Sequence, residues 1–260
     1  MNNQNLSSKK TNLFIVGTIK AATTSIYNYL KQQPNIFFPD IKELHYFSNV
    51  ISITDQKTEF NKHNIQHSRV IDKYDDYKSL YLNADTVSSK FLGDCSPTYL
   101  SDTQTPKKIF EYNPSAKIVV CIRNPIDRII SHYQMNVNRN TETRGFFKAI
   151  NEDFKKPNKI MFIDDKNVEL RFYGEQIKRF YKYFLKNQVY IIKFEDLNQN
   201  SEKTIKKLVN FLGLKSLEAQ IFNKRYNTYS KPRLKIFLKL KKIYYKDQER
   251  LFKLIGFKYF

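Results

Sequence analysis

Apolar residues gather in short runs, and these runs alternate with longer segments in which apolar positions recur at helical spacing. The runs cover residues 12–17, 36–38, 90–94, 117–122 and 188–194. The run at 117–122 is rich in β-branched residues and has no polar alternation, which predicts a parallel strand covered on both faces. The segments between the runs predict helices at 24–33, 105–112, 125–137, 170–185 and 202–212.

Several of these boundaries carry residues typical of helix ends. Pro34 ends the first helix, Asn124 can cap a helix that begins at Pro125, and Gly213 can close the last one. Strands that alternate with helices predict an α/β fold, a doubly wound domain with a central parallel sheet flanked by helices. We expect a disordered lead at 1–11 and a single domain over 12–260.

Two segments do not follow the alternation. Residues 140–168 are polar and irregular, and we expect a surface insertion there. Residues 231–260 contain ten Lys and Arg against two acids, and their spacing predicts a basic helix at 234–255. This helix can dock on the domain, or it can touch an anionic membrane surface. Both alternatives remain open from the sequence.

The formal net charge is +20, and most of it lies after residue 130. Such a field favours anionic ligands, but a Lys-rich and Asn-rich composition also drifts basic without functional demand, so no nucleic-acid partner is expected from charge alone. Cys95 and Cys121 stand far apart, and the four histidines lack metal-ligand spacing. We therefore expect no metal site. We also expect a cytoplasmic protein, because no apolar leader or membrane span is present.

The most informative segment is Val-Gly-Thr-Ile-Lys-Ala-Ala-Thr-Thr at 16–24. It follows an apolar run and precedes a helix, so backbone N–H groups at the helix start can face an anion. Lys20 adds a full charge, and Thr23 and Thr24 add hydroxyls. A Walker A loop places its lysine directly before the Ser or Thr, whereas Lys20 lies three residues earlier, so an ATP or GTP loop does not fit.

A second cationic position follows the strand at 117–122. Arg123 comes directly after that strand, and Ser131 lies two helical turns further on. A guanidinium matches a phosphate in two parallel hydrogen bonds, so this pair can hold a second phosphate. In open α/β sheets, ligands bind beyond the carboxyl ends of the strands, which places Lys20 and Arg123 at the same edge.

These motifs together resemble the sulfotransferases that use 3′-phosphoadenylyl sulfate (PAPS), in particular the bacterial and heparan-sulfate-type branch. The resemblance covers nearly the whole chain. It rests on V-G-T-I-K-A-A-T-T-S-I, K-E-L-H-Y-F, G-D-C-S-P-T-Y, I-V-V-C-I-R-N-P-I-D-R-I-I-S-H-Y and Y-N-T-Y-S-K-P-R. It implies a P-loop-like domain that transfers a sulfuryl group to a hydroxyl or amine, with a glycan or other carbohydrate-containing molecule, or a small molecule, as acceptor.

The resemblance also implies roles for individual residues. The 5′-phosphosulfate loop would be Lys20, Ala21, Ala22, Thr23 and Thr24, and the 3′-phosphate contacts would be Arg123 and Ser131. A late loop with Tyr226, Lys231 and Arg233 would close over the nucleotide. PAPS would be the donor co-substrate, and Lys20 would neutralise the departing oxygen.

The general base implied by the resemblance is Glu43. His45 is a rival, because the two residues would share one face if the segment were extended. The chain departs from the family pattern at Ala22, where glycine is usual and where a Cβ is tolerable if φ is negative. It also departs at Cys95, where animal heparan-sulfate enzymes carry a lysine.

Two other classes of function remain possible from the residues. A P-loop kinase or NTPase shares the strand–loop–helix plan, and a non-catalytic basic module would explain the charge. The position of Lys20 and the arginine, not aspartate, after the strand at 117–122 oppose the first class. The second does not account for two ordered phosphate motifs. We expect residues 50–80 and 140–168 to shape the acceptor pocket. Tyr74, Tyr77 and Tyr81 could stack on sugar rings of an acceptor, but we expect them in the core.

Overall fold

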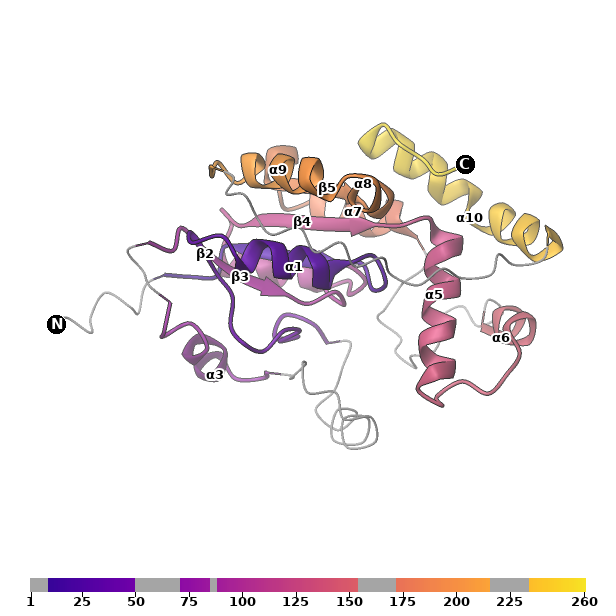
Figure 1. Ribbon diagram of the computed structural model, residues 1–260, viewed down its shortest axis with the longest axis horizontal. Coiled ribbons are helices and arrows are strands. Elements are labelled where there is room, and N and C mark those ends of the chain that lie inside the picture. The colour runs from indigo at the N-terminus through magenta and orange to yellow at the C-terminus, as the bar shows by residue number, and fades with distance from the viewer. Residues whose placement is uncertain (1–8, 50–70, 85–87, 154–171, 216–233) are drawn as a thin grey trace.

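The computed structural model describes residues 9–49, 71–84, 88–153, 172–215 and 234–260 (Figure 1). Its centre is a parallel five-stranded sheet with the order β2-β3-β1-β4-β5. The strands are β1 (Leu13–Gly17), β2 (Ile36–Phe37), β3 (Phe91–Cys95), β4 (Lys117–Ile122) and β5 (Val189–Lys193). The connection after β1 leads toward the β2 edge and the connection after β4 leads to β5 at the opposite edge, so β1 and β4 flank a topological switch point. The predicted α/β fold is confirmed.

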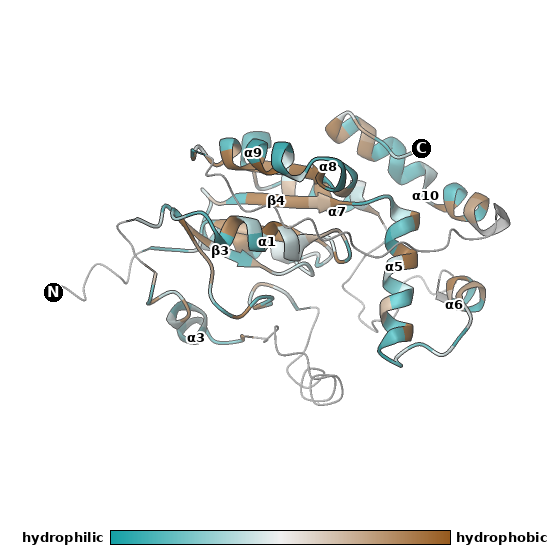
Figure 2. Ribbon diagram, viewed as in Figure 1, coloured by the Kyte–Doolittle hydropathy of each residue, from teal (hydrophilic) through white to brown (hydrophobic). Residues whose placement is uncertain are grey.

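Helices cover both faces of this sheet. They are α1 (Thr23–Lys31), α3 (Tyr74–Ser79), α4 (Thr105–Tyr112), α5 (Pro125–Asn138), α6 (Phe146–Asp153), α7 (Tyr173–Tyr181), α8 (Phe194–Gln199), α9 (Ser201–Phe211) and α10 (Leu234–Ile255), with a short 3₁₀ turn at Lys186–Gln188. In Figure 2 the central strand β4 is almost wholly hydrophobic, whereas α5, α9 and α10 alternate between hydrophobic and polar positions. Such alternation is expected of helices that bury one side only.

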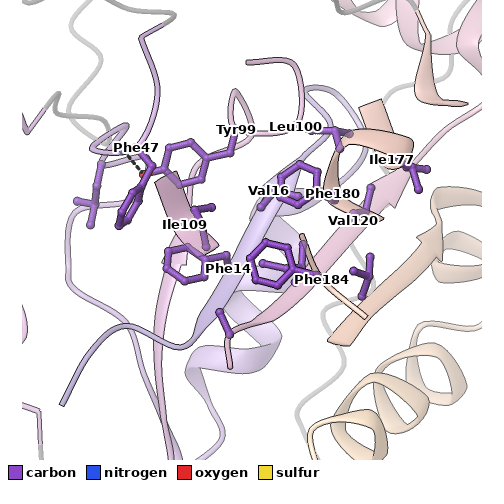
Figure 3. Packing of buried hydrophobic residues seen from close by; sticks show 14 of the residues in the cluster. Phe14, Val16, Phe47, Tyr99, Leu100, Ile109, Val120, Ile177, Phe180 and Phe184 are labelled. Carbon is purple, nitrogen blue, oxygen red and sulfur yellow. Dashed lines mark hydrogen bonds between the residues drawn. The ribbon is translucent and has the colours of Figure 1, made fainter. Parts of the chain in front are cut away.

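Alternate residues of the central strands point into two separate apolar layers. Phe14 of β1 and Val120 of β4 pack with Ile177 and Phe180 of α7 (Figure 3). Leu13, Ile15, Val119 and Cys121 face the other layer, with α1 and α9. Burying one such large apolar side chain contributes about 1.5–3 kcal/mol. Both faces are therefore covered, as the uninterrupted β4 sequence predicts.

The helix α10 packs on α7 and α5, and it has the bounds that the sequence predicts. Its buried side contributes Leu240, Tyr244 and Leu251. Asp247 accepts a hydrogen bond from the backbone N–H of Gly174 at 2.9 Å, which ties α10 to the first turns of α7. Among the described residues, no helix combines the length and apolar character needed to cross a bilayer.

The structure differs from the sequence expectations in several places. The short helices α3 and α8 were not predicted, and α7 is shorter than the expected 170–185. The segment expected to be irregular from residue 140 contains α6, because Ala149 and Ile150 find a buried surface to pack on. Residues 9–11, which belong to the expected lead at 1–11, contact the domain. Thr11 is buried there, and its backbone N–H donates to the Tyr112 hydroxyl at 3.1 Å.

A close contact joins the end of β1 to the turn after β3. The backbone N–H of Leu100 donates to the carbonyl of Val16 at 2.7 Å. Gly17 has φ +147°, and a Cβ built there would lie 2.7 Å from the carbonyl oxygen of Pro97 and 2.8 Å from Cβ of Leu100. Only glycine fits this position.

Candidate active site

The loop after β1 runs over residues 18–22 and leads into α1. Thr18 is buried, and its backbone N–H donates to the carbonyl of Cys121 at 2.7 Å, which ties the loop to β4. Lys20 is half-buried and adopts φ +66°. Thr23 is buried and Thr24 exposed, both in the first turn of α1. The loop therefore stands at a helix N-terminus, where backbone N–H groups and the helix dipole favour an anion.

Ala22 does not have the negative φ under which a Cβ at this position is tolerable. Its φ is +62°, in the left-handed region, and its carbonyl accepts the first helical hydrogen bond from the backbone N–H of Ile26. A Cβ in this conformation costs about 1–2 kcal/mol relative to glycine. The condition of a negative φ is therefore not met at Ala22, because the tight entry into α1 requires a left-handed residue at this point.

Arg123 meets the Lys20 loop across the switch point. Its Nη1 donates to the carbonyl oxygen of Lys20 at 3.1 Å, and its guanidinium carbon lies 4.4 Å from the ring centroid of Phe194 in α8. Asn124 caps α5 by accepting from the backbone N–H groups of Ile126 and Asp127. The two phosphate motifs of the sequence are thus joined directly.

The first turns of α5 bury Ser131 and His132 near these cations. Burial lowers the pKa of His132 to about 3, and the positive charges of Arg128, Lys20 and Arg139 act in the same direction. The imidazole is neutral at physiological pH, because both burial and these positive charges oppose a protonated ring. We call residues 18–24 and 123–132 the cationic side of the site. It is suited to a ligand with two anionic groups.

The loop carrying Glu43 and His45 lies at the end of β3. The backbone N–H of Glu43 donates to the carbonyl of Cys95 at 3.1 Å. The thiol of Cys95 lies 3.8 Å from the carbonyl oxygen of Thr23, so this loop and the start of α1 share one anchor. Burial raises the pKa of Cys95 to about 12. Its thiol is therefore a neutral, buried packing group.

Glu43 and His45 do not lie on an extended strand. Their φ values are +64° and +56°, so the condition of an extended segment, under which they would share one face, is not met. The backbone turn nevertheless brings them together, with Nε2 of His45 3.9 Å from Oε2 of Glu43. Glu43 keeps about one third of its side chain exposed and pairs with the ammonium of Lys42.

His45 is almost fully buried, and its ring is fixed from the other side. Its Nδ1 lies 2.8 Å from Oγ1 of Thr98, and its backbone N–H donates to Oγ of Ser96. Burial lowers the pKa of His45 to about 4, against the opposing pull of the Glu43 carboxylate. A neutral ring in this setting can orient Glu43, and it has little access to solvent.

The segment G-D-C-S-P-T-Y supplies a buried hydrogen-bond network beneath this loop, which the sequence reasoning did not identify. Asp94 accepts from Ser96 at 2.7 Å, from Tyr99 at 2.8 Å and from Tyr77 at 3.1 Å. Burial raises the pKa of Asp94 to about 6, whereas these hydrogen bonds hold it lower than burial alone would. We call residues 42–48 and 94–102 the carboxylate side.

The three tyrosines expected in the core differ in their burial. Tyr77 and Tyr81 are buried in the core, as expected, whereas Tyr74 is 45% exposed. Tyr226, Lys231 and Arg233 lie outside the described residues. Within the described ranges, no three His, Cys, Asp or Glu side chains are grouped so that they could hold a metal ion.

The fold and this site define an α/β protein with a doubly cationic anion site at the switch point and a carboxylate beside it. The chain belongs to the sulfotransferase-domain family, whose model matches residues 10–253. It is 26% identical over 204 residues to the human bifunctional heparan sulfate N-deacetylase/N-sulfotransferase 3, covering 77% of this chain and 22% of that protein. It thus spans about a fifth of that relative's length.

Two further proteins are similar to this chain, one in sequence and one in fold. The chain is 25% identical over 126 residues to the membrane-associated sulfotransferase kil1 of Dictyostelium discoideum, covering 48% of this chain and 23% of that protein. A solved structure, a sulfotransferase from Alicyclobacillus acidocaldarius, superposes with a TM-score of 0.79 at 24% identity. The match covers 96% of this chain and 98% of that one. The shared fold therefore extends over essentially the whole chain.

Proposed function

We propose that this chain transfers a sulfuryl group from PAPS to a hydroxyl or amine of a carbohydrate-containing acceptor. The observation that carries the proposal is the hydrogen bond from Arg123 to the carbonyl of Lys20, because it brings two phosphate-binding motifs together across the switch point. A donor with phosphate groups on both the 3′ and 5′ oxygens of one ribose matches this pair. Membership of the sulfotransferase-domain family supports the same donor.

In the proposed reaction the acceptor oxygen or nitrogen attacks sulfur in line with the departing oxygen. The new bond to sulfur forms as the bond between sulfur and the 5′-phosphate oxygen breaks, which releases adenosine 3′,5′-bisphosphate. Such transfers depend mostly on positioning and charge stabilisation. Lys20 neutralises the charge on the departing oxygen, and the loop N–H groups with Thr23 and Thr24 assist it. Arg123 and Ser131 hold the 3′-phosphate.

Glu43 takes the acceptor proton in this proposal. Its partly exposed carboxylate can meet an acceptor from solvent, whereas His45 is buried, bonded to Thr98 and neutral. His45 then acts as a positioning residue for Glu43, and Lys42 balances the carboxylate charge before the acceptor binds. The side chains of this chain supply the acid–base and charge roles.

A carbohydrate acceptor is supported by the likeness to the heparan sulfate N-deacetylase/N-sulfotransferase. The test is transfer of labelled sulfate from PAPS to a panel of glycans, lipids and small phenols. We expect labelled glycan and release of adenosine 3′,5′-bisphosphate. A second measurement compares thermal stabilisation by adenosine 3′,5′-bisphosphate and by ATP. Stabilisation by ATP alone would contradict the proposed donor and favour an NTPase.

We also propose that α10 touches an anionic membrane surface. Three of its exposed residues, Leu238, Tyr245 and Phe252, follow one another at intervals of seven and lie on one side of the helix. The other exposed positions that the structure describes on α10 are lysines, namely Lys239, Lys242, Lys246 and Lys253. The acids of this helix are engaged elsewhere, Asp247 with Gly174 and Glu249 with Lys258. An apolar row beside lysines suits anionic lipid.

Sedimentation with vesicles tests this contact. We expect binding to phosphatidylcholine vesicles that contain phosphatidylserine, loss of binding in high salt, and loss on changing Leu238 and Phe252 to Gln. The matched control is Leu185→Gln, at an exposed apolar position outside α10, just before the 3₁₀ turn at Lys186–Gln188. Equal binding to neutral vesicles, or no effect of the α10 changes, would contradict the proposal. We propose a cytoplasmic location as well, which the free, buried thiols of Cys95 and Cys121 support.

A further inference from the structure

The carboxylate of Glu195 lies beside the cationic side, and its position calls for an explanation. Glu195 is in the first turn of α8, directly after β5. Its Oε1 accepts a hydrogen bond from the backbone N–H of Asn124 at 2.9 Å. An acid so close to an anion site opposes ligand binding through its charge. It must therefore contribute something that outweighs this repulsion.

Glu195 and its neighbour Phe194 hold in place the residues that join β4 to α5, and we call these contacts the Glu195 brace. Phe194 stacks against the guanidinium of Arg123, and the next residue, Glu195, holds the backbone of Asn124. Two consecutive residues of α8 thus fix two consecutive residues of the cationic side. Because Asn124 also caps α5, the same contact sets where that helix begins.

The second oxygen of Glu195 receives a hydrogen bond from a distant part of the chain. The hydroxyl of Tyr259 donates to Oε2 at 3.0 Å. Gly256, with φ +71°, ends α10 and lets the chain turn back along it. The backbone N–H of Tyr259 then donates to Oε1 of Gln248 at 2.9 Å, which fixes the returning segment.

An aromatic contact supports the same arrangement. The ring of Phe257 lies against that of Tyr259, with centroids 4.9 Å apart, and the ammonium of Lys193 lies 4.5 Å from the Phe257 ring. Lys193 is the last residue of β5. Residues 256–260 are therefore packed at the carboxyl end of β5, next to the cationic side.

We propose that Tyr259 is a positioning residue for the donor: through Glu195 it holds Arg123 and Asn124 in place for the 3′-phosphate. This inference rests on the proposed function, which assigns that phosphate to Arg123. It makes the segment after α10 part of the donor-binding machinery. Tyr259 does not touch the donor itself, so its effect is on binding of the 3′-phosphate and leaves sulfuryl transfer unchanged.

The experiment measures dissociation constants of adenosine 3′,5′-bisphosphate and of adenosine 5′-phosphate for the wild type and for Tyr259→Phe. Loss of a hydrogen bond to a charged group predicts binding of the bisphosphate weakened roughly 10-fold. Binding of the 5′-phosphate should be unchanged, and kcat at saturating PAPS should stay within about twofold. The matched control is Tyr245→Phe, whose side chain is 59% exposed on α10.

A double variant separates positioning from a general structural role. If Tyr259 acts through Arg123, then Tyr259→Phe should cost nothing further in an Arg123→Ala background. Equal weakening of both nucleotides, or additive losses in the double variant, would overturn the inference. A wild type that binds both nucleotides equally would instead contradict the proposed donor. The two failures are therefore distinguishable.

Discussion

The cationic side and the carboxylate side meet at the same edge of the sheet, but they are held together differently. The cationic side consists of two strand ends with their following helices. Its cross-links end on backbone carbonyls: the backbone N–H of Thr18 donates to Cys121, and the guanidinium of Arg123 donates to Lys20. The carboxylate side depends on bonds between buried side chains that are distant in sequence, such as His45 with Thr98, 53 residues on, and Tyr77 with Asp94, 17 residues on. Substitutions of loop residues on the cationic side should therefore affect chemistry, whereas those of buried, bonded residues on the carboxylate side should also affect stability.

The largest expected effect is that of Lys20→Ala. Removing one preorganised charge donor typically costs about 10²–10³ in kcat, and we expect at least this loss in sulfate transfer from PAPS. The free energy of unfolding should change little, because Lys20 is half-buried in a loop. The control is Lys31→Ala, an exposed lysine of α1 paired with Asp40. Near-normal turnover by Lys20→Ala would contradict its role.

The carboxylate side is tested by Glu43→Gln and His45→Asn. We expect kcat to fall roughly 100-fold for Glu43→Gln, with an unchanged melting temperature, because a general base is lost from a partly exposed position. His45→Asn should lower kcat less and lower the melting temperature, because a buried, bonded ring is replaced. Kinetics and thermal unfolding of both variants distinguish the roles. The opposite ranking of kcat values would make His45 the base.

Arg123→Ala tests whether the cationic side binds the 3′-phosphate through Arg123. The wild type should prefer PAPS over adenosine 5′-phosphosulfate, which lacks the 3′-phosphate. We expect the variant to lose this preference, by roughly 10–100-fold in relative KM, because a charged hydrogen bond to phosphate disappears. The comparison variant is Arg250→Ala, whose arginine pairs with Glu175 away from the site. Retained preference in Arg123→Ala would place the 3′-phosphate elsewhere.

Each side buries one histidine, and both should make the fold sensitive to acid. The folded-state pKa values, about 4 for His45 and about 3 for His132, lie below the unfolded value of 6.5. The unfolded chain therefore binds protons first, so the stability from each group is complete above pH 6.5 and is lost as the pH falls. From pH 7 to 5, one such histidine accounts for about 2 kcal/mol.

Urea unfolding at pH 7 and pH 5 measures this loss in the free energy of unfolding. His132→Asn should reduce the acid-induced loss by that amount. Asp94 acts in the opposite direction: its pKa of about 6 is above the unfolded value, so the folded state binds a proton first as the pH falls below 6. Asp94→Asn should therefore enlarge the acid-induced loss. Equal pH dependence in all three proteins would contradict the assigned protonation states.

The smallest expected effect is a gain in the free energy of unfolding. Ala22→Gly relieves a left-handed alanine, worth about 1–2 kcal/mol, but gives flexibility to the unfolded chain, which offsets about 0.4–1 kcal/mol. We expect a net stabilisation of about 0.5–1 kcal/mol in urea unfolding. Ala21→Gly is the control, because Ala21 is buried and has no left-handed backbone, so the same change there should destabilise.

The same contrast explains how far the sequence could predict the molecule. The strands, the order of elements, the Lys20 loop and the Arg123 position follow from local runs and caps, and the structure confirms where they lie. The turn that joins Glu43 to His45 could not be foreseen, because its left-handed residues are fixed by bonds to Ser96 and Thr98 far along the chain. The Glu195 brace was missed for the same reason, since its partner Tyr259 lies 64 residues away.

The contact between Gly17 and the turn at residues 97–100 has a consequence for protein engineering. The backbone N–H of Leu100 donates to the carbonyl of Val16, and the space beside Gly17 is already filled by the Pro97 carbonyl and the Leu100 side chain. The separation of the two halves of the site is therefore set by the main chain and does not change when loop residues are exchanged. Libraries that vary either half can treat position 17 as a fixed reference point, whereas any larger residue there would shift both halves at once.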